Sequence, residues 1–558
     1  MTSTLRGADI VTRSLAAAGV DRIFTLSGNH VMSVFDASID SELSLVHVRH
    51  EGAAVHMADA WARLTGQVGI VLLTGGPGHA NGVSALYTAL ASESPVVMLS
   101  GHAPLSQLGL GAFQEMRQAD LAAPVTKASW TASDARRVGH DIARAMRTAA
   151  SGRPGPVHLS LPTDVLDTIV DDDGTLVPGR AAYEPQPRAL SQAMADDVLA
   201  TLMAARRPLI LAGPLASTAR ARAPAADLAA ATGIPVVTME SPRGVNDPSL
   251  GAFAEVLADA DCVLLLGKQP DFTLGFARPP LLRKDCRIIQ IDPDPAVIAR
   301  FSGMAGGFDV LPMAVQADVV PAISALQGCA RRQHEAADWR QEVDHAIAYR
   351  PPEWQQLRSG PEEALHVVEL CRAIQPLLCA HPDAVFVSDG GELGQWAQAC
   401  LSARVRVING PAGAIGSGLA FAGAARMTTA DAPVIALLGD GTAGFHLSEF
   451  DTAVRYDLPF VAVIGNDACW NAEYQIQLRN YGPDRLVGCE LRPARYDLVA
   501  EALGGHGEHV TTAAELPAAL ERALASGKPA CVNVVISRTP APMIRRPGYA
   551  GRKDAPTP

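Results

Sequence analysis

The strongest constraint on the fold of this 558-residue chain is a pair of short apolar runs that each end in glycine and polar residues. Residues 434–438 precede the triplet Gly-Asp-Gly at 439–441, and residues 460–464 precede Gly-Asn-Asp at 465–467. Apolar runs of this length are typical of buried strands in a parallel sheet. Because ligands bind at the carboxyl ends of such strands, we expect a binding site where these two runs end.

The side chains at these strand ends suit a metal-held diphosphate. Asp440 and Asp467 offer carboxylate oxygens, which Mg²⁺ prefers, and phosphates of a bound molecule commonly complete the shell of this ion. Gly439 and Gly441 allow a phosphate to approach the backbone. Glycine and aspartate also fill ordinary turns, so the triplet alone is weak. The triplet together with the second strand end predicts a Mg²⁺–diphosphate site.

The composition is that of a large globular protein. Apolar residues make up 48% of the chain and charged residues 19%, and the length predicts about three domains. The net charge of −12 argues against nucleic acid as a partner. The nine cysteines have no metal-binding spacing, and neither a signal-peptide segment nor an apolar run of membrane-spanning length is found. We therefore expect a cytoplasmic protein with no membrane partner.

Strand–glycine–helix repetition divides the sequence into three α/β units separated by polar linkers. The units cover residues 1–170, 189–330 and 364–540, and a basic tail follows at 541–558. This alternation predicts three doubly wound parallel-sheet domains. The tail is interpreted as a candidate lid.

At the residues named above, the sequence resembles the thiamine diphosphate (ThDP) enzymes of the acetohydroxyacid synthase, benzaldehyde lyase and 2-hydroxyacyl-CoA lyase (oxalyl-CoA decarboxylase-like) family. The resemblance covers nearly the whole chain. It implies the ThDP-dependent decarboxylase fold, with pyrimidine-binding, central and diphosphate-binding domains in that order. It also implies that Asp440, Asp467 and the backbone carbonyl of Cys469 hold Mg²⁺, although the family usually has asparagine at the position of Asp467. The resemblance places three further residues against the diphosphate, namely Gly439, Gly441 and Asn466.

Glu51 lies in a segment that follows an apolar run and opens a predicted helix. An acidic residue favours a helix N-terminus in any protein, so the segment alone leaves a structural role open. The resemblance matches Glu51 to the glutamate that shares a proton with N1′ of the cofactor's aminopyrimidine, which prepares the cofactor for proton loss at C2. It also implies cofactor contacts for four residues in glycine-rich segments that otherwise read as ordinary turns, namely Pro77, Asn81, Gly413 and Ile415.

Two polar residues are expected to face the substrate. His30 matches a pocket histidine of benzaldehyde lyase, and Gln114 matches a glutamine of both that enzyme and acetohydroxyacid synthase. His79 and His102 lie on comparable loops and are further candidates. For each histidine, a satisfied structural role is the alternative.

The central unit and the tail suggest an adenine-containing group. Asp292 follows a predicted strand, where it would hold a ribose or form an Asp-Pro turn. ADP or CoA is the expected group, with FAD ranked below them. Two clusters of basic residues could bind the phosphates of such a group, because guanidinium groups suit phosphates. For the cluster in the tail, a solvated segment without a ligand is the alternative. The clusters comprise Arg278, Arg283 and Lys284 in the central unit, and Arg545, Arg546, Arg552 and Lys553 in the tail.

These inferences predict a ThDP- and Mg²⁺-dependent carbon–carbon lyase or carboligase. The expected substrate is a 2-hydroxyacyl-CoA or an acyloin, cleaved to two carbonyl products and formed in reverse. One alternative is a 2-oxoacid decarboxylating carboligase of the acetolactate synthase type. Another is a non-catalytic ThDP- or nucleotide-binding regulator, which the presence of Glu51 argues against. The resemblance implies a homodimer or homotetramer with active sites at the subunit interface.

Overall fold

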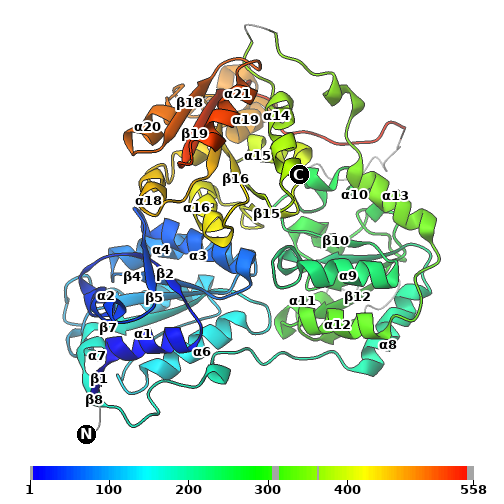
Figure 1. The fold of residues 1–558 in the computed structure, drawn as a ribbon. Coiled ribbons are helices and arrows are strands. Elements are labelled where there is room, and N and C mark those ends of the chain that lie inside the picture. Colours follow the sequence, from blue (N-terminus) through cyan, green and yellow to red (C-terminus); the bar gives the residue numbers. More distant parts are fainter. Residues whose placement is uncertain (1–3, 304–312, 361–362, 549–558) are drawn as a thin grey trace. The chain divides into compact units, whose positions relative to one another are not determined.

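The computed structural model describes residues 4–303, 313–360 and 363–548, and the chain divides into two compact units (Figure 1). Unit 1 combines the first 186 residues with two short segments of the later chain, 419–430 and 446–458. The remaining residues form unit 2. Both later segments fall inside the stretch 364–540 that the sequence assigns to one domain, so part of that stretch packs with the N-terminal region.

Unit 1 contains a six-stranded parallel sheet in which all neighbouring strands run in the same direction. Its strands are β2 (Arg22–Leu26), β3 (Ser44–His47), β4 (Gly69–Leu73), β5 (Val96–His102), β6 (Ala128–Thr131) and β7 (Val157–Pro162), in the order β3-β2-β4-β5-β7-β6. A separate antiparallel pair is formed by β1 (Thr4–Arg6) and β8 (Ile169–Asp171).

Helices cover both faces of this sheet. They are α1 (Gly7–Ala17), α2 (Met32–Ile39), α3 (Glu51–Thr65), α4 (Pro77–Ala91), α5 (Gln118–Ala122), α6 (Val138–Ala150) and α7 (Thr163–Asp167). Figure 1 shows α3 and α4 on one face and α1 and α6 on the other. The later segments add most of α16 (Gly418–Thr428) and all of α18 (Glu449–Arg455).

Unit 2 contains two further parallel sheets. The central one consists of β9 (Pro208–Ala212), β10 (Val236–Thr238), β11 (Cys262–Leu266), β12 (Arg287–Asp292) and β13 (Met313–Gln316), in the order β10-β9-β11-β12-β13. The C-terminal one consists of β14 (Val385–Asp389), β15 (Val405–Ile408), β16 (Val434–Gly439), β17 (Val461–Asn466), β18 (His506–Val510) and β19 (Ala530–Val535), in the order β15-β14-β16-β17-β19-β18.

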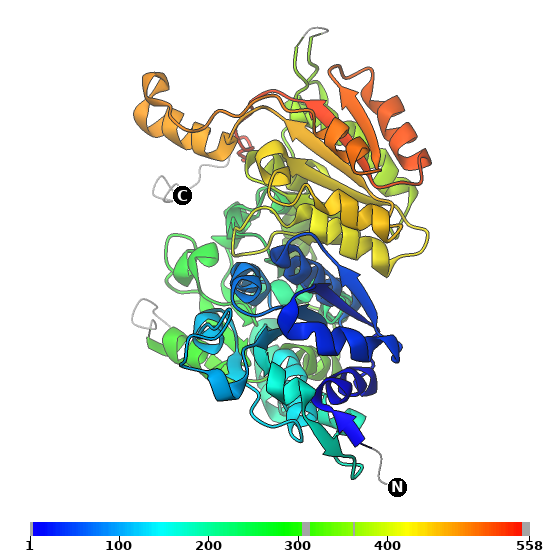
Figure 2. The ribbon, with the colours of Figure 1, turned by 90° about the vertical axis from the view of Figure 1, so that its left-hand side faces the viewer.

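The helices of unit 2 follow the strands in alternation. In the central part they are α8 (Gln192–Met203), α9 (Arg222–Thr232), α10 (Phe253–Leu257), α11 (Pro295–Gly303), α12 (Val319–Cys329) and α13 (Ala337–Ala348). In the C-terminal part they are α14 (Val367–Ala380), α15 (Glu392–Cys400), α17 (Asp440–Ala443), α19 (Asn471–Tyr481), α20 (Tyr496–Ala502) and α21 (Leu516–Ala525). In Figure 2 the orange α19 extends away from the C-terminal sheet. Among the helices of the described residues, none has the length and apolar character needed to cross a membrane.

The continuous apolar runs of the sequence are explained by cores on both faces of each sheet. In β11, Leu264 packs into a core with helices α8, α9 and α12, whereas Leu265 packs into a second core with α10 and α13. Successive residues of a strand point to opposite faces, so both faces require apolar side chains. The three parallel sheets confirm the predicted α/β class.

Candidate active site

The two acidic strand ends of unit 2 lie side by side. Strands β16 and β17 are adjacent and parallel, and Gly439 pairs with Gly465 in their register. Asp440 and Asp467 therefore follow their strands at the same edge of the sheet, and both line a cavity of about 80 Å³. The same cavity is lined by Ile415, Gly439, Gly441 and Cys469, as the resemblance implied.

The carboxyl groups of Asp440 and Asp467 are set up to bind a cation. One oxygen of Asp440 accepts a hydrogen bond from the backbone N–H of Gly441 at 2.9 Å. The other oxygen of Asp440 and Oδ1 of Asp467 are buried and have no hydrogen-bond partner among the described residues. Burial raises the pKa of Asp440 to about 6, and burial together with the charge of Asp440 raises the pKa of Asp467 to about 7. Such a pair is costly unless a cation compensates it.

The carboxylates of Asp440 and Asp467 fit a metal ion whose remaining ligands are a backbone carbonyl and the oxygens of a phosphate. Within the described part of the chain, no group of three or more histidine, cysteine or acidic side chains is placed to hold a metal. Asp440 and Asp467 therefore need further oxygen ligands, and Mg²⁺ accepts backbone carbonyls and phosphates in that role. Cys469, whose carbonyl the resemblance implies as the third ligand, also lines the cavity.

The two glycines of the triplet differ in what they allow. A Cβ atom on Gly441 would lie 2.6 Å from Cζ3 of Trp470, so the close approach of this ring requires glycine. A Cβ on Gly439 would have no neighbour closer than 4.0 Å, so this position borders open space. Gly441 thus serves the packing of the site, whereas Gly439 leaves room for a ligand.

Asn466 has a different environment from the one that the resemblance implies. Its side-chain amide donates to the carbonyl of Ala494 at 2.9 Å and to Oδ1 of Asn533 at 3.2 Å, and its oxygen accepts from the backbone N–H of Ala468. Asn466 is buried and is not among the residues that line the cavity. Its side chain therefore shapes the loop that carries Asp467.

Arg538 is a second loop-forming residue, and sequence reasoning missed it. Its guanidinium donates to the carbonyls of Asp467 at 3.0 Å and Ala468 at 3.1 Å, and it pairs with Glu490 at 3.2 Å. These contacts fix the backbone on which Asp467 is mounted. They also bring a positive charge close to the second carboxylate of the pair, and this charge lowers the pKa of Asp467 in opposition to burial.

The loop that carries Ile415 is held by Asp389, at the end of β14. One oxygen of this buried carboxyl accepts from the backbone N–H groups of Gly416 at 3.0 Å and Gly418 at 2.7 Å. Burial raises the pKa of Asp389 to about 6. Sequence reasoning missed this residue, although the rule that identified Asp440, a carboxylate at the end of an apolar run, applies here too. Gly413 lies in the same loop with a φ of +66°, a conformation that favours glycine.

In unit 1, Glu51 is the first residue of α3. Its carboxylate accepts a hydrogen bond from the side-chain amide of Asn81 at 3.1 Å. Asn81 lies in the first turns of α4, which begins at Pro77. The structure thus brings together Glu51 and Asn81, two of the residues that the resemblance assigned to the pyrimidine ring.

The two expected substrate residues lie on neighbouring loops of unit 1. His30 is 4% exposed, and its ring stacks on that of Phe113 with centroids 5.9 Å apart. Burial lowers the pKa of His30, which favours a neutral ring. Gln114 follows Phe113, and a Cβ on Gly76 would lie 2.8 Å from the Cβ of Gln114. Both residues therefore meet near the loop that follows β4.

The other two histidines are structural. His102 hydrogen-bonds with the carbonyls of Ala103 at 3.2 Å and Met116 at 3.0 Å through its two ring nitrogens. His79 is fully buried and hydrogen-bonds with the hydroxyl of Ser100 at 2.9 Å, and burial lowers its pKa to about 4.

Gln118 organises the strand ends beneath the Gln114 loop and was not identified from the sequence. Its side-chain oxygen accepts from the backbone N–H of Gly76 at 2.8 Å. Its amide donates to the carbonyl of Gly101 at 3.1 Å and the hydroxyl of Ser160 at 3.0 Å. One buried side chain thus connects residues at the ends of β4, β5 and β7.

Several residues that the sequence assigned to an adenine-containing group have partners within the protein. Asp292 is 0% exposed, and its side chain accepts from the backbone N–H of Asp294 at 2.8 Å, so the Asp-Pro turn interpretation is correct. Arg283 pairs with Asp285, and Arg546 is bound by the carboxylates of Glu255 and Glu342. Arg552 and Lys553 lie outside the described residues.

Three parallel sheets, an acidic pair at adjacent strand ends and a glutamate at a helix start together define a multidomain α/β enzyme that uses a diphosphate cofactor. Comparison with family models agrees. The N-terminal thiamine pyrophosphate binding domain matches residues 5–121, the central domain 195–308, and the C-terminal binding domain 389–534. The chain belongs to the thiamine pyrophosphate enzyme family.

Curated relatives of the chain fall into two groups. A "Probable acetolactate synthase" of Mycobacterium bovis is 33% identical over 95% of this chain and 96% of its own length. A "2-hydroxyacyl-CoA lyase 2" of Bos taurus is 31% identical, and one of Homo sapiens is 30% identical, each over 96% of this chain and 91% of its own length. The chain is thus related to both acetolactate synthases and 2-hydroxyacyl-CoA lyases.

Proposed function

We propose that this protein is a Mg²⁺- and ThDP-dependent enzyme that cleaves, and in reverse forms, a carbon–carbon bond next to a carbonyl carbon. The observation that carries the proposal is the pair of buried carboxylate oxygens, on Asp440 and Asp467, that lack a partner among the described residues. A divalent cation bound to a diphosphate would satisfy both oxygens. Glu51 favours catalysis over mere binding, because binding alone needs no proton-sharing carboxylate at the pyrimidine.

The residues divide the work according to their chemistry. Asp440, Asp467 and the carbonyl of Cys469 would hold Mg²⁺, and Ile415 would support the cofactor at the same cavity. When bound, ThDP supplies a nucleophilic ring carbon and accepts the electron pair of the bond that breaks. Glu51 would hold the proton shared with the pyrimidine N1′ atom, while its hydrogen bond from Asn81 orients the carboxylate.

For the substrate we favour a 2-hydroxyacyl-CoA or an acyloin. The relatives named 2-hydroxyacyl-CoA lyase 2 support the first class. The lowered pKa of His30 keeps its ring uncharged, and the Gln114 amide is uncharged as well. Both side chains can donate and accept hydrogen bonds, which suits the hydroxyl and carbonyl oxygens of such substrates.

A second candidate is a 2-oxoacid decarboxylating carboligase. The Mycobacterium bovis relative named as a probable acetolactate synthase favours it, at 33% identity over nearly the full length. The two candidates share the cofactor site and differ only in the bond that breaks. Release of CO₂ from pyruvate therefore separates them.

Two further properties complete the proposal. We propose a homodimer or homotetramer with active sites at the subunit interface, as the family resemblance implies. ADP or CoA remains the proposed group for the central part of unit 2, with FAD ranked below them. Light scattering measures the assembly, and native mass spectrometry after soaking with each nucleotide measures the bound group.

The deciding experiment supplies ThDP and Mg²⁺ and assays 2-hydroxyisobutyryl-CoA, benzoin and pyruvate side by side. Cleavage of the acyl-CoA or of benzoin to two carbonyl products is the expected result. Turnover of pyruvate alone, with CO₂ release, would replace the lyase by the carboligase. Glu51→Gln is the control, expected to bind ThDP and to lose most turnover. A wild-type protein that binds ThDP but turns over none of the three would favour the regulator.

A further inference from the structure

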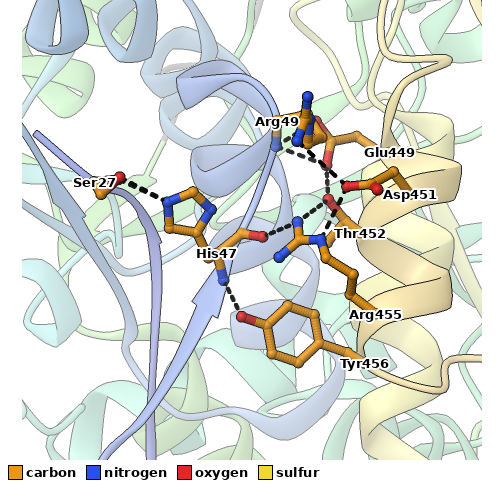
Figure 3. Close-up of polar contacts among 8 residues, drawn as sticks. All are labelled: Ser27, His47, Arg49, Glu449, Asp451, Thr452, Arg455 and Tyr456. Carbon is orange, nitrogen blue, oxygen red and sulfur yellow. Dashed lines mark hydrogen bonds and ion pairs between the residues drawn. The ribbon is translucent and has the colours of Figure 1, made fainter.

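Helix α18 and the residue after it are anchored to the edge strand β3 within unit 1 (Figure 3). The hydroxyl of Tyr456 accepts from the backbone N–H of His47 at 2.7 Å and donates to the carbonyl of Leu45 at 2.9 Å. Arg455 donates to the carbonyl of His47. These contacts satisfy backbone groups of an edge strand, and they join segments about 400 residues apart in the sequence.

Glu449 makes a different kind of contact at the other end of the helix. Its side chain is 3% exposed, and its two oxygens lie 3.1 and 3.3 Å from the backbone nitrogen of Arg49, which donates to them. The backbone N–H of His50 also faces this carboxylate, and the hydroxyl of Thr452 donates to it at 2.6 Å. Three donors thus converge on one buried carboxyl group.

The contact of Glu449 lies immediately before Glu51. His50 is the N-cap of α3, and its ring accepts from the backbone N–H of Gly52 at 3.0 Å. The ring of His446, one turn before Glu449, packs on the ring of His50 with centroids 5.3 Å apart. Residues 446–449 therefore hold the start of α3 both through a ring contact and through backbone hydrogen bonds.

A carboxylate is well suited to this place because it only accepts hydrogen bonds. Burial raises the pKa of Glu449, and the three donors lower it in opposition. The nearby guanidinium of Arg49 pairs with Asp451 at 3.7 Å, on the exposed side of the helix. A glutamine at position 449 would keep one acceptor oxygen and replace the other with an NH₂ group, which weakens the set of hydrogen bonds from Arg49, His50 and Thr452.

We propose that Glu449 is a positioning residue for Glu51. This inference rests on the proposed function, in which Glu51 shares a proton with the cofactor. By fixing the backbone of residues 49 and 50, Glu449 sets where α3 starts and therefore where the Glu51 carboxylate points. Misplacement of a reacting group by about 1 Å can slow a step about 100-fold, so a backbone anchor beside Glu51 affects rate more than binding.

Glu449→Gln tests this role, with two controls from the same contact region. Tyr456→Phe removes hydrogen bonds to β3, and Asp451→Asn removes the ion pairs of Asp451 with Arg49 and Arg455. The measurement is exchange of the C2 proton of bound ThDP for deuterium, together with ThDP affinity by calorimetry. For Glu449→Gln we expect exchange slowed about tenfold or more, with affinity within about twofold of wild type. Both controls are expected to keep the wild-type exchange rate, even where Tyr456→Phe lowers the melting temperature.

A second readout needs no cofactor. Amide hydrogen exchange of a peptide covering residues 44–56 in the ThDP-free protein should accelerate in Glu449→Gln and stay unchanged in Asp451→Asn. If Glu449→Gln does not fold, Thr452→Val is the second variant, and a several-fold slowing of C2 exchange is expected. It removes the hydroxyl that donates to the Glu449 carboxylate and accepts from Arg455.

The outcomes separate this inference from the function on which it rests. Wild-type protein that binds ThDP without accelerating C2 exchange over free ThDP would refute the proposed function. Fast exchange in the wild type and equally fast exchange in Glu449→Gln would refute the positioning role alone. Equal slowing in Tyr456→Phe, or loss of ThDP binding in Glu449→Gln, would also overturn it, because Glu449 would then act only on stability.

Discussion

Replacement of Gly441 by alanine should destabilise the cofactor site through a steric clash. The added Cβ would lie 2.6 Å from Cζ3 and 2.7 Å from Cε3 of Trp470, well inside normal contact distance. The Trp470 ring is a broad, rigid group, so relief requires a shift of the ring or of the loop. Overpacking of this kind typically costs about 1–3 kcal/mol. Because Gly441 lies in α17, where alanine is conformationally favoured, the backbone itself adds no penalty.

The assay is chemical denaturation of the Gly441→Ala and Gly439→Ala proteins beside wild type. Gly439 is the matched control, because the nearest atom to a Cβ there would be the Thr442 hydroxyl oxygen at 4.0 Å. We expect Gly441→Ala to lose about 1–3 kcal/mol of unfolding free energy, and Gly439→Ala to stay near wild type in stability while binding ThDP more weakly. Equal stability of the two variants would contradict the packing argument.

Two further predictions concern residues that hold the site loops. Gln118→Ala should lower the unfolding free energy by about 1–3 kcal/mol, because the buried N–H of Gly76 loses its acceptor. Replacement of the exposed Gln107 by alanine is the control, and an equal loss of unfolding free energy in both variants would refute the role of Gln118. Asp389→Asn keeps an acceptor for Gly416 and Gly418 but carries no charge. Burial raises the folded-state pKa of Asp389 to about 6. The stability that the protonated Asp389 carboxyl group contributes is therefore complete below the ordinary pKa of aspartate and is lost as the pH rises through about 6. The stability of Asp389→Asn relative to wild type should therefore improve by on the order of 2 kcal/mol between pH 4 and pH 7, and a pH-independent difference in thermal melts would contradict this.

The parts of the site that the sequence predicted are those that follow from strand ends and helix starts. Asp440 and Asp467 were found because each follows an apolar run, and adjacent parallel strands bring their ends together. Ile415 and Asn81 were assigned through resemblance, and the structure places them at the cavity and beside Glu51. An apolar run and the glycine that follows it are local features of the sequence, so they can be recognised without knowledge of the three-dimensional structure.

The parts that the sequence did not reveal depend on long-range partners. Arg538 reaches carbonyls about 70 residues away, and Glu449 reaches a backbone N–H 400 residues away. The same limit applies to Asn466, whose amide donates to the carbonyl of Ala494 and to the side-chain oxygen of Asn533. Asp292 also lies at the end of a strand, but its side chain accepts a hydrogen bond from the nearby backbone N–H of Asp294. A strand end marks where a side chain lies, whereas its partner is set by packing.

The central claim, that Asp440 and Asp467 hold a divalent cation for ThDP, is tested most directly by calorimetric titration of ThDP with Mg²⁺ and with a chelator. We expect wild-type protein to bind ThDP strongly only with Mg²⁺, Asp440→Ala to bind it weakly in both conditions, and the exposed control Asp431→Ala to behave as wild type. Mg²⁺-dependent binding of ThDP by Asp440→Ala with wild-type affinity would contradict the account.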